Sequence, residues 1–287
     1  MPLIPLPQRH GMSTLPALPR HRVWLPAAIV LLLSACQPAA QAPATASAPA
    51  AAPSPASAPV AAAPVHRLAS LPDGVELRGK LAAAYGWSDA AGQQLLVLGE
   101  RQDERAADGT QSAVLYAAQY TLGQGKPRRQ WMLSDGVERC EFDAGAGFDL
   151  DALSFPDLNR DGVLETVIGY HSTCTSDVSP NDYKLILHAG KAKYGLRGLD
   201  RQGMSWLDPE HGLSSRLPLP TDCSPQAQLA LQAKGWEREF EPPYLPGCYT
   251  DENDFATAPP AFVKYMRKQW FARMRELESS WIKRQQE

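Results

Sequence analysis

The loop with the clearest capacity for chemistry reads FPDLNRDGVLETVIGY and spans residues 155–170. Its acidic and amide side chains stand at alternate positions, and they are followed by a glycine that permits a sharp reversal of the chain. Oxygen donors in this arrangement converge on a hard cation when the backbone curls around it. We therefore predict a structural Ca²⁺ site, with Val163 contributing its backbone carbonyl. The predicted ligands are Asp157, Asn159, Asp161, Val163 and Glu165.

The same spacing opens an EF-hand loop, but position 12 of that loop would be Ile168 instead of glutamate, and the flanks read as strands. A helix–loop–helix calcium sensor is therefore rejected. The ten residues resemble instead the calcium loops of FG-GAP and integrin-type β-hairpins, in which the ninth position supplies a carboxylate. Two alternatives stay open, namely a metal-free turn whose carboxylates accept hydrogen bonds from its own amides, and a catalytic metal.

Further carboxylates flank this loop at positions 141, 143, 149, 151, 177 and 182. Paired carboxylates can hydrolyse glycosidic bonds when they are held at the right separation. We assign no catalytic residue, because the chain has no GxSxG, HExxH, phosphate-binding or dinucleotide-binding motif. The stretch STCTSDVSP connects two expected strands, and loops often carry binding residues. The candidates for such a binding loop are His171, Asp177 and Ser179.

Residues 1–35 read as a lipoprotein signal peptide, in which basic residues precede a short apolar run. The run ends in Leu-Ser-Ala-Cys and resembles a bacterial lipobox, which implies that Cys36 is acylated and begins the mature chain. Three acyl chains would hold the protein stably on a membrane. Gln37 in place of aspartate favours the outer membrane of a Gram-negative-type cell envelope, with the domain facing the periplasm or the cell surface.

Residues 36–65 carry the lipidated cysteine and an Ala/Pro-rich stretch without charge, which we expect to be a disordered tether. Residues 66–287 then form one globular domain of 222 residues. Subtracting the three arginines of the signal from the 28 Lys and Arg leaves 25 against 31 Asp and Glu, a net charge of −6. This acidic balance gives no support to a nucleic-acid partner.

Four cysteines remain when Cys36 is acylated, and an even number in an exported protein indicates two disulfides. Four cysteines allow three connectivities. We expect nearest neighbours to pair, and a zinc site is the alternative, although the chain has no CxxC motif. The expected pairs are Cys140–Cys174 and Cys223–Cys248.

The fold class predicted for the domain is mainly antiparallel β, meander-like or sandwich-like, and α+β overall. Alternating apolar residues and turn signals predict strands connected by short turns. Ser224 and Pro225 mark the start of a short helix. A long C-terminal helix follows Pro260, and an apolar stripe from Phe262 to Trp281 is expected to pack on a sheet. The expected strands lie within 80–101, 114–122, 130–133, 164–171, 183–188 and 193–197.

Several stretches resemble a family of bacterial exported proteins labelled surface polysaccharide biosynthesis protein. They are WSDAAGQQLLVL (87–98), DLNRDGVLETVIGYHSTCTSDVSP (157–180), KLILHAGKAKYGLRG (184–198) and the Trp-containing C-terminal helix. The resemblance spans most of the domain but not the tether. It implies a role in the cell envelope that is linked to surface polysaccharide, without naming a reaction.

We therefore predict an outer-membrane-type lipoprotein with a non-catalytic binding or assembly-support role in the envelope. Its expected partners are the membrane, through the lipid anchor, and surface polysaccharide or envelope proteins. Two alternatives stay open. The first is a glycan-active enzyme that uses the acidic loops, and the second is an accessory lipoprotein that binds other proteins.

Overall fold

The computed structural model of the chain describes residues 64–177, 179–201, 221–232 and 245–287. The predicted signal peptide, the predicted acylation site Cys36 and nearly all of the expected tether lie outside the described residues. The chain divides into two units, 1–55 and 56–287, and every described residue belongs to the second unit. Within that part of the chain, none of the helices combines the length and apolar character needed to cross a membrane.

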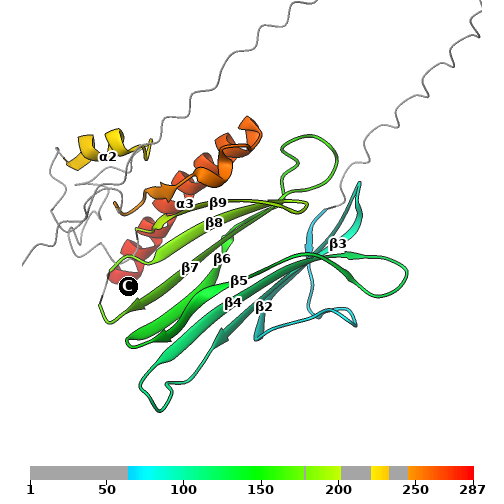
Figure 1. Cartoon of the computed structure of the whole chain (residues 1–287), viewed down its shortest axis with the longest axis horizontal. Coiled ribbons are helices and arrows are strands. Elements are labelled where there is room, and N and C mark those ends of the chain that lie inside the picture. Colours follow the sequence, from blue (N-terminus) through cyan, green and yellow to red (C-terminus); the bar gives the residue numbers. More distant parts are fainter. Residues whose placement is uncertain (1–63, 178, 202–220, 233–244) are drawn as a thin grey trace, which may run out of the picture. The chain divides into compact units, whose positions relative to one another are not determined.

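In the described part of the chain, ten strands form two antiparallel sheets of five strands each, and each sheet is a meander that follows the order of the chain (Figure 1). The first sheet contains β1 (His66–Arg67), β2 (Lys80–Asp89), β3 (Gly92–Gln102), β4 (Gln111–Leu122) and β5 (Arg128–Cys140). The second sheet contains β6 (Asp143–Ser154), β7 (Thr166–Thr175), β8 (Asp182–Ala189), β9 (Ala192–Leu199) and β10 (Tyr249–Asp251). The antiparallel β character that the sequence predicts is confirmed.

The two sheets share a hydrophobic core. Leu96 and Leu98 of β3 belong to the same buried cluster as Ile168 of β7 and Ile186 of β8. Val97, which lies between these two leucines, points to the opposite face, because successive strand residues face opposite sides of a sheet. It therefore joins a separate cluster, which the segment after β1 covers through Leu71 and other side chains. Both faces of the first sheet are consequently buried along β2, β3 and β4, whereas one face of β5 is exposed.

The long helix α3 (Pro260–Gln286) covers the other face of the second sheet, where its apolar side chains join those of β7, β8 and β9 in one cluster. The indole N–H of Trp270 donates to the carbonyl of Gly247 at 2.9 Å, so this fully buried ring has its polar atom satisfied. Burying side chains of this size stabilises the fold by about 1.5–3 kcal/mol each. The buried apolar positions of α3 are Phe262, Met266, Trp270, Met274 and Leu277.

Two disulfides join the expected neighbours, Cys140 to Cys174 and Cys223 to Cys248. The first joins the end of β5 to β7 and so connects the two sheets covalently. The second joins the segment before α2 (Pro225–Gln232) to the segment before β10. The predicted pairing is confirmed, and the zinc alternative is wrong for these four residues.

The structure also differs from the sequence prediction. The strand β6 was not expected, because its sequence DAGAGFDLDALS contains glycines and aspartates that obscure the apolar alternation. The strand β5 is longer than the predicted 130–133, since its pairing with β4 continues to Cys140. The segment before α3 contains β10 and the 3₁₀ helix η2 (Asn253–Phe255), which are not among the elements that the sequence predicts.

Candidate functional site

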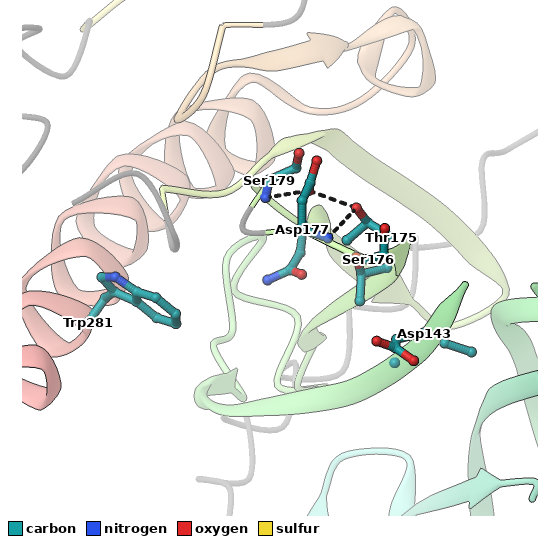
Figure 2. A pocket seen from close by; sticks show the side chains of 10 residues that line it. Asp143, Thr175, Ser176, Asp177, Ser179 and Trp281 are labelled. Carbon is teal, nitrogen blue, oxygen red and sulfur yellow. Dashed lines mark hydrogen bonds between the residues drawn. The ribbon is translucent and has the colours of Figure 1, made fainter. Parts of the chain in front are cut away.

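A polar groove of about 310 Å³ lies on the second sheet, at the end where β6 begins and β7 finishes. We call it the β6–β7 groove. It is on the face that α3 covers, because Asp143 and Gly145 share their side of β6 with Asp149, which contacts the helix. Figure 2 shows its side chains, which come from β6, from the end of β7 and the loop after it, and from the end of α3.

The floor of the groove is open because β6 presents Gly145 to it. Gly145 pairs with Thr173 and Gly147 pairs with His171 in the antiparallel ladder. A β-carbon added at Gly145 would lie 3.1 Å from the γ-carbon of Thr173, and one at Gly147 would lie 3.1 Å from the His171 ring. A larger residue at Gly145 would therefore crowd β7 and fill the groove, whereas one at Gly147, which does not line the groove, would crowd His171.

The loop after β7 forms one wall and is held by Asp177. One oxygen of this carboxylate accepts hydrogen bonds from the Thr175 hydroxyl at 2.7 Å and from the Ser179 amide at 2.8 Å. The bonds from Ser179 and Thr175 lower the pKa of the exposed Asp177 carboxyl, so it is ionised at neutral pH. No hydrogen bond to its second oxygen comes from the described residues.

The opposite wall is Trp281, which projects from the last turns of α3 toward the groove (Figure 2). The sequence placed this residue in the apolar stripe that packs on the sheet. The structure instead leaves the ring only partly buried, because the stripe reaches the end of the sheet near Leu277. The Arg284 guanidinium lies 5.6 Å from the centre of the indole ring, within the range of a cation–π contact.

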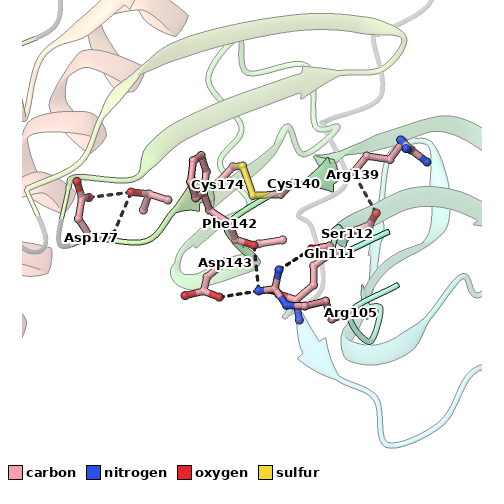
Figure 3. Close-up of a disulfide and its surroundings, with 12 residues drawn as sticks. Arg105, Gln111, Ser112, Arg139, Cys140, Phe142, Asp143, Cys174 and Asp177 are labelled. Carbon is pink, nitrogen blue, oxygen red and sulfur yellow. Dashed lines mark hydrogen bonds and ion pairs between the residues drawn. A yellow bond between two sulfur atoms is a disulfide. The ribbon is translucent and has the colours of Figure 1, made fainter. Parts of the chain in front are cut away.

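The Cys140–Cys174 disulfide stands beside the groove and fixes its rim (Figure 3). Cys174 lies between two groove residues on β7, while the buried Cys140 closes β5. Arg105 reinforces the rim by donating to the Asp143 carboxylate at 3.0 Å and to the Phe142 carbonyl at 3.3 Å. The rim is therefore connected to the loop between β3 and β4, and the side chain of Phe142 remains 53% exposed.

Two of the three residues predicted for a binding loop, Asp177 and Ser179, line the groove. The third, His171, does not line it but shares its face of β7 with Thr173 and lies against Gly147. Sequence reasoning missed the contribution of Trp281. It also missed the alternating glycines of β6, of which Gly145 lies in the floor and is the signal that could have located it.

The predicted calcium loop lies at the other end of the β6–β7 pair, about nine strand residues away along β7, or on the order of 30 Å. Its carboxylates accept hydrogen bonds from backbone amides of the same loop. The two oxygens of Asp157 accept from the amides of Asp161 and Gly162, each at 3.1 Å. Asn159 donates to Asp161, whose other oxygen accepts from the amide of Val163.

Glu165 closes the same loop from inside the protein. Its carboxylate is buried and accepts a hydrogen bond from the Leu158 amide at 2.7 Å. Burial raises the pKa of Glu165, the Leu158 amide opposes this, and the nearby charges of Asp161 and Asp157 raise it further. A bound cation would relieve this accumulation of negative charge.

No cluster of three or more histidine, cysteine or acidic side chains in the described ranges has the arrangement of a metal site. A carboxylate has lone pairs for both an amide and a cation, so the hydrogen bonds of the loop are compatible with either a calcium loop or a metal-free turn. The Ca²⁺ site therefore stays a prediction.

The loop is also docked on the first sheet through Asp89, at the turn between β2 and β3. One Asp89 oxygen accepts from the indole of Trp87 at 2.8 Å and from the amide of Leu164 at 3.2 Å. In addition, the amide of Ala90 donates to the carbonyl of Gly162 at 2.9 Å. These contacts give the loop a structural function, whether or not it holds a cation.

The remaining carboxylates near the groove have structural partners. Asp149 is buried against Arg273 and the hydroxyl of Tyr183. Burial raises the pKa of the Asp182 carboxyl. The nearby charge of Lys184 lowers this pKa, and the charge of Asp135 raises it. Within the groove itself, Asp143 and Asp177 are the carboxylates that a ligand could reach.

Comparison of the chain with known protein families, curated proteins and solved structures finds no match. The resemblance to surface polysaccharide biosynthesis proteins therefore stays a prediction. The function has to be inferred from the geometry of the groove and from the pattern of the sequence.

Proposed function

We propose that the protein is a lipid-anchored component of an outer membrane and that its domain binds surface polysaccharide without cleaving it. The observation that supports this proposal best is the β6–β7 groove. It combines a floor of strand backbone, a wall of hydroxyl and carboxylate groups, and one indole ring. Concave sites with a few convergent polar groups beside an aromatic surface are typical of small-molecule recognition, and sugars present both hydroxyl groups and apolar C–H faces.

The proposal assigns separate functions to the other parts of the chain. Cys36 carries the acyl chains, and the Ala/Pro-rich tether allows the domain to reach away from the membrane. The tether could extend roughly 90 Å at about 3.1 Å per residue. The calcium loop and the two disulfides stabilise the domain, because they lie at the junctions of its elements and outside the groove.

Calorimetric titration tests the proposal with the mature chain carrying Cys36→Ser, which removes the acylation site. The probes are polysaccharide released from lipopolysaccharide and fragments of capsule. We expect binding heat that is lost in Trp281→Ala and in Gly145→Val, and kept in the matched control Met132→Ala on the exposed face of β5. Absence of heat, together with unchanged surface glycans in a deletion strain, would overturn the proposal.

The two alternatives predict different outcomes. A glycan-active enzyme would release new reducing ends from these probes and would lose that turnover in Asp177→Ala or Asp143→Ala while remaining folded. An accessory lipoprotein would give no heat with glycans but would crosslink to an envelope protein. Phe142, whose ring is 53% exposed beside the groove, would be a contact for such a partner.

A further inference from the structure

The outer side of α3 carries three exposed basic side chains, which we call the α3 basic stripe. They are Lys264, Lys268 and Arg275. An α-helix turns by about 100° per residue, so the three side chains point within about 40° of one another. Lys264 and Lys268 each come two positions, or about 200°, before a buried residue, which is Met266 and Trp270 respectively. The stripe therefore lies on the side of the helix opposite the second sheet.

The positive charges of the stripe are not neutralised by the described part of the chain, in which none of the three side chains has an ion pair or a hydrogen bond. The two acids within α3 have other partners. Glu276 accepts a hydrogen bond from Arg273 at 2.7 Å. Glu278 is buried against Arg201. The stripe thus presents its full positive charge to the surroundings.

This pattern differs from that of an ordinary solvated helix face, which mixes the two signs of charge because opposite charges three or four positions apart stabilise the helix. Lys264 and Lys268 are four positions apart and repel each other, and no acid at that spacing from either one relieves the repulsion. The expected mature chain nevertheless has a net charge of −6. Positive charge that is gathered on one face of an acidic protein indicates a negatively charged partner.

The extent of the stripe fits an anionic surface better than a single small anion. Lys264 and Arg275 are eleven positions apart, which is about 16 Å along the helix axis. A hollow of about 460 Å³ reaches Lys264 but neither of the other two side chains. A membrane with anionic headgroups presents many phosphates in one plane, so it can approach all three charges at once.

The proposed lipid anchor makes a membrane the nearest anionic surface. Each Lys or Arg close to such a surface strengthens binding roughly fivefold, so the stripe supplies roughly a hundredfold. This affinity is weak for a protein in free solution. A tethered domain, however, meets its own membrane at an effective concentration on the order of millimolar, where weak contacts are sufficient. An anionic polymer that is not attached to the chain lacks this advantage.

We propose that the α3 basic stripe docks the domain onto the anionic headgroups of the membrane that holds its lipid anchor. This inference rests on the proposed function, which supplies the anchor and the tether, and it uses none of the residues that line the β6–β7 groove. In the docked state α3 lies along the membrane, and the first sheet, on the far side of the second, faces away from it. Added salt screens the charges and releases the domain.

Energy transfer from the tryptophans of the protein to a dansyl lipid tests the inference. The unacylated mature chain is coupled through the Cys36 thiol to a maleimide lipid, which replaces the acyl anchor while the other cysteines stay in their disulfides. Vesicles of phosphatidylglycerol mixed with phosphatidylcholine are compared with vesicles of phosphatidylcholine alone. We expect stronger transfer on the anionic vesicles, and we expect added NaCl to reduce it to the neutral level.

A triple variant identifies the surface that docks. Lys264→Gln/Lys268→Gln/Arg275→Gln should lower the docking equilibrium constant on anionic vesicles roughly a hundredfold, and so give the transfer that neutral vesicles give. Melting curves confirm that the variant is folded, which we expect because the three side chains are exposed. Equal transfer on both kinds of vesicle in the parent chain would overturn the inference.

The matched control removes three exposed positive charges that lie outside α3. It is Lys126→Gln/Arg128→Gln/Lys191→Gln, and it changes the net charge by the same amount as the stripe variant. It should dock as the parent chain does. An equal loss of docking in both triple variants would show that net charge alone attracts the domain, and it would overturn the assignment to α3.

Further outcomes separate this inference from the proposed function. If cells incorporate no labelled palmitate at Cys36, the anchor and the docking are both overturned. If the stripe variant loses binding of alginate, a polyuronate, while transfer is equal on both kinds of vesicle, the partner of the stripe is an anionic polysaccharide and the membrane inference is overturned. Gly145→Val should lose polysaccharide binding and keep vesicle docking. Loss of both in this variant would contradict separate functions of the groove and the stripe.

Discussion

Arg273 of α3 and Asp149 of β6, which are 124 residues apart in the sequence, form a bidentate ion pair in the structure. The Nε and Nη2 atoms of the guanidinium donate to the two carboxylate oxygens at 2.5 and 2.6 Å. The Tyr183 hydroxyl donates to the same carboxylate at 2.6 Å. The side chains of the pair are only 12% and 6% exposed. This ion pair holds the helix that carries Trp281 against the strand that forms the groove floor.

We expect Arg273→Ala to destabilise the domain by roughly 3–5 kcal/mol, because it leaves the buried Asp149 charge without its partner. Urea denaturation measures the effect. Arg275→Ala is the matched control on the exposed side of the same helix, and it should change the free energy of unfolding by less than about 0.5 kcal/mol. A loss below about 1 kcal/mol in Arg273→Ala would show that the ion pair does not hold α3 in place.

The sequence predicts the elements that have regular patterns and misses those that depend on distant partners. The strand at 182–189 was predicted closely as 183–188, whereas β7 was predicted as 164–171 and continues to Thr175, into the stretch that was expected to be a connection. The strand β6 was missed because glycine at positions 145 and 147 removes the apolar alternation, and its pairing is set by β7. Pairing of this kind is decided by cross-strand packing and burial more than by local preference.

The candidate site could be predicted only in part for the same reason. Asp177 and Ser179 belong to a local loop whose composition indicates binding. Trp281 follows them by about a hundred residues, and it continues the helical period of a stripe that is otherwise buried. The helical spacing of apolar residues does not show where the sheet beneath the helix ends. A tryptophan over the sheet is buried in the core, whereas one beyond its end can line a groove.

The two disulfides should contribute similar stability and different effects on binding. The pairs close loops with sequence separations of 34 and 25, and the chain-entropy model gives each roughly 3.5–4 kcal/mol. We expect the double variants Cys140→Ala/Cys174→Ala and Cys223→Ala/Cys248→Ala each to lose about this much free energy of unfolding in denaturant titrations. The Cys140–Cys174 variant should also weaken glycan binding, because Cys174 lies between Thr173 and Thr175. Equal binding in both double variants would contradict the function of this disulfide at the rim.

Calcium should raise the melting temperature without affecting the groove. A ligand at 100 times its dissociation constant stabilises the folded state by about 2.7 kcal/mol. We expect this shift when CaCl₂ is added to chelator-treated protein, and we expect Asp157→Ala and Glu165→Gln to abolish it. Glycan binding should be the same with and without chelator, because the loop lies at the far end of the β6–β7 pair. Identical melting curves with and without Ca²⁺ would leave the metal-free turn as the correct interpretation.

Acid should destabilise the domain in part through His188, whose imidazole is buried and stacks on Trp131 with ring centres 3.7 Å apart. Neither ring nitrogen has a hydrogen-bond partner among the described residues. Burial, with a smaller contribution from the charge of Lys193, lowers the pKa of His188 to about 3. The folded state therefore resists protonation at a site that the unfolded chain protonates near pH 6.5.

Because the folded pKa lies below the unfolded one, His188 has no effect on stability above about pH 6.5 and an increasing destabilising effect as the pH falls toward 3. The slope contributed by this residue is about 1.4 kcal/mol per pH unit within that window. His188→Phe keeps a ring against Trp131 and removes the titration, and His188→Leu is a smaller second variant. Denaturant titrations at pH 7 and pH 5 should show a smaller acid loss in both variants than in the parent chain. An equal acid loss in all three proteins would assign the acid sensitivity to carboxylates instead of to this buried histidine.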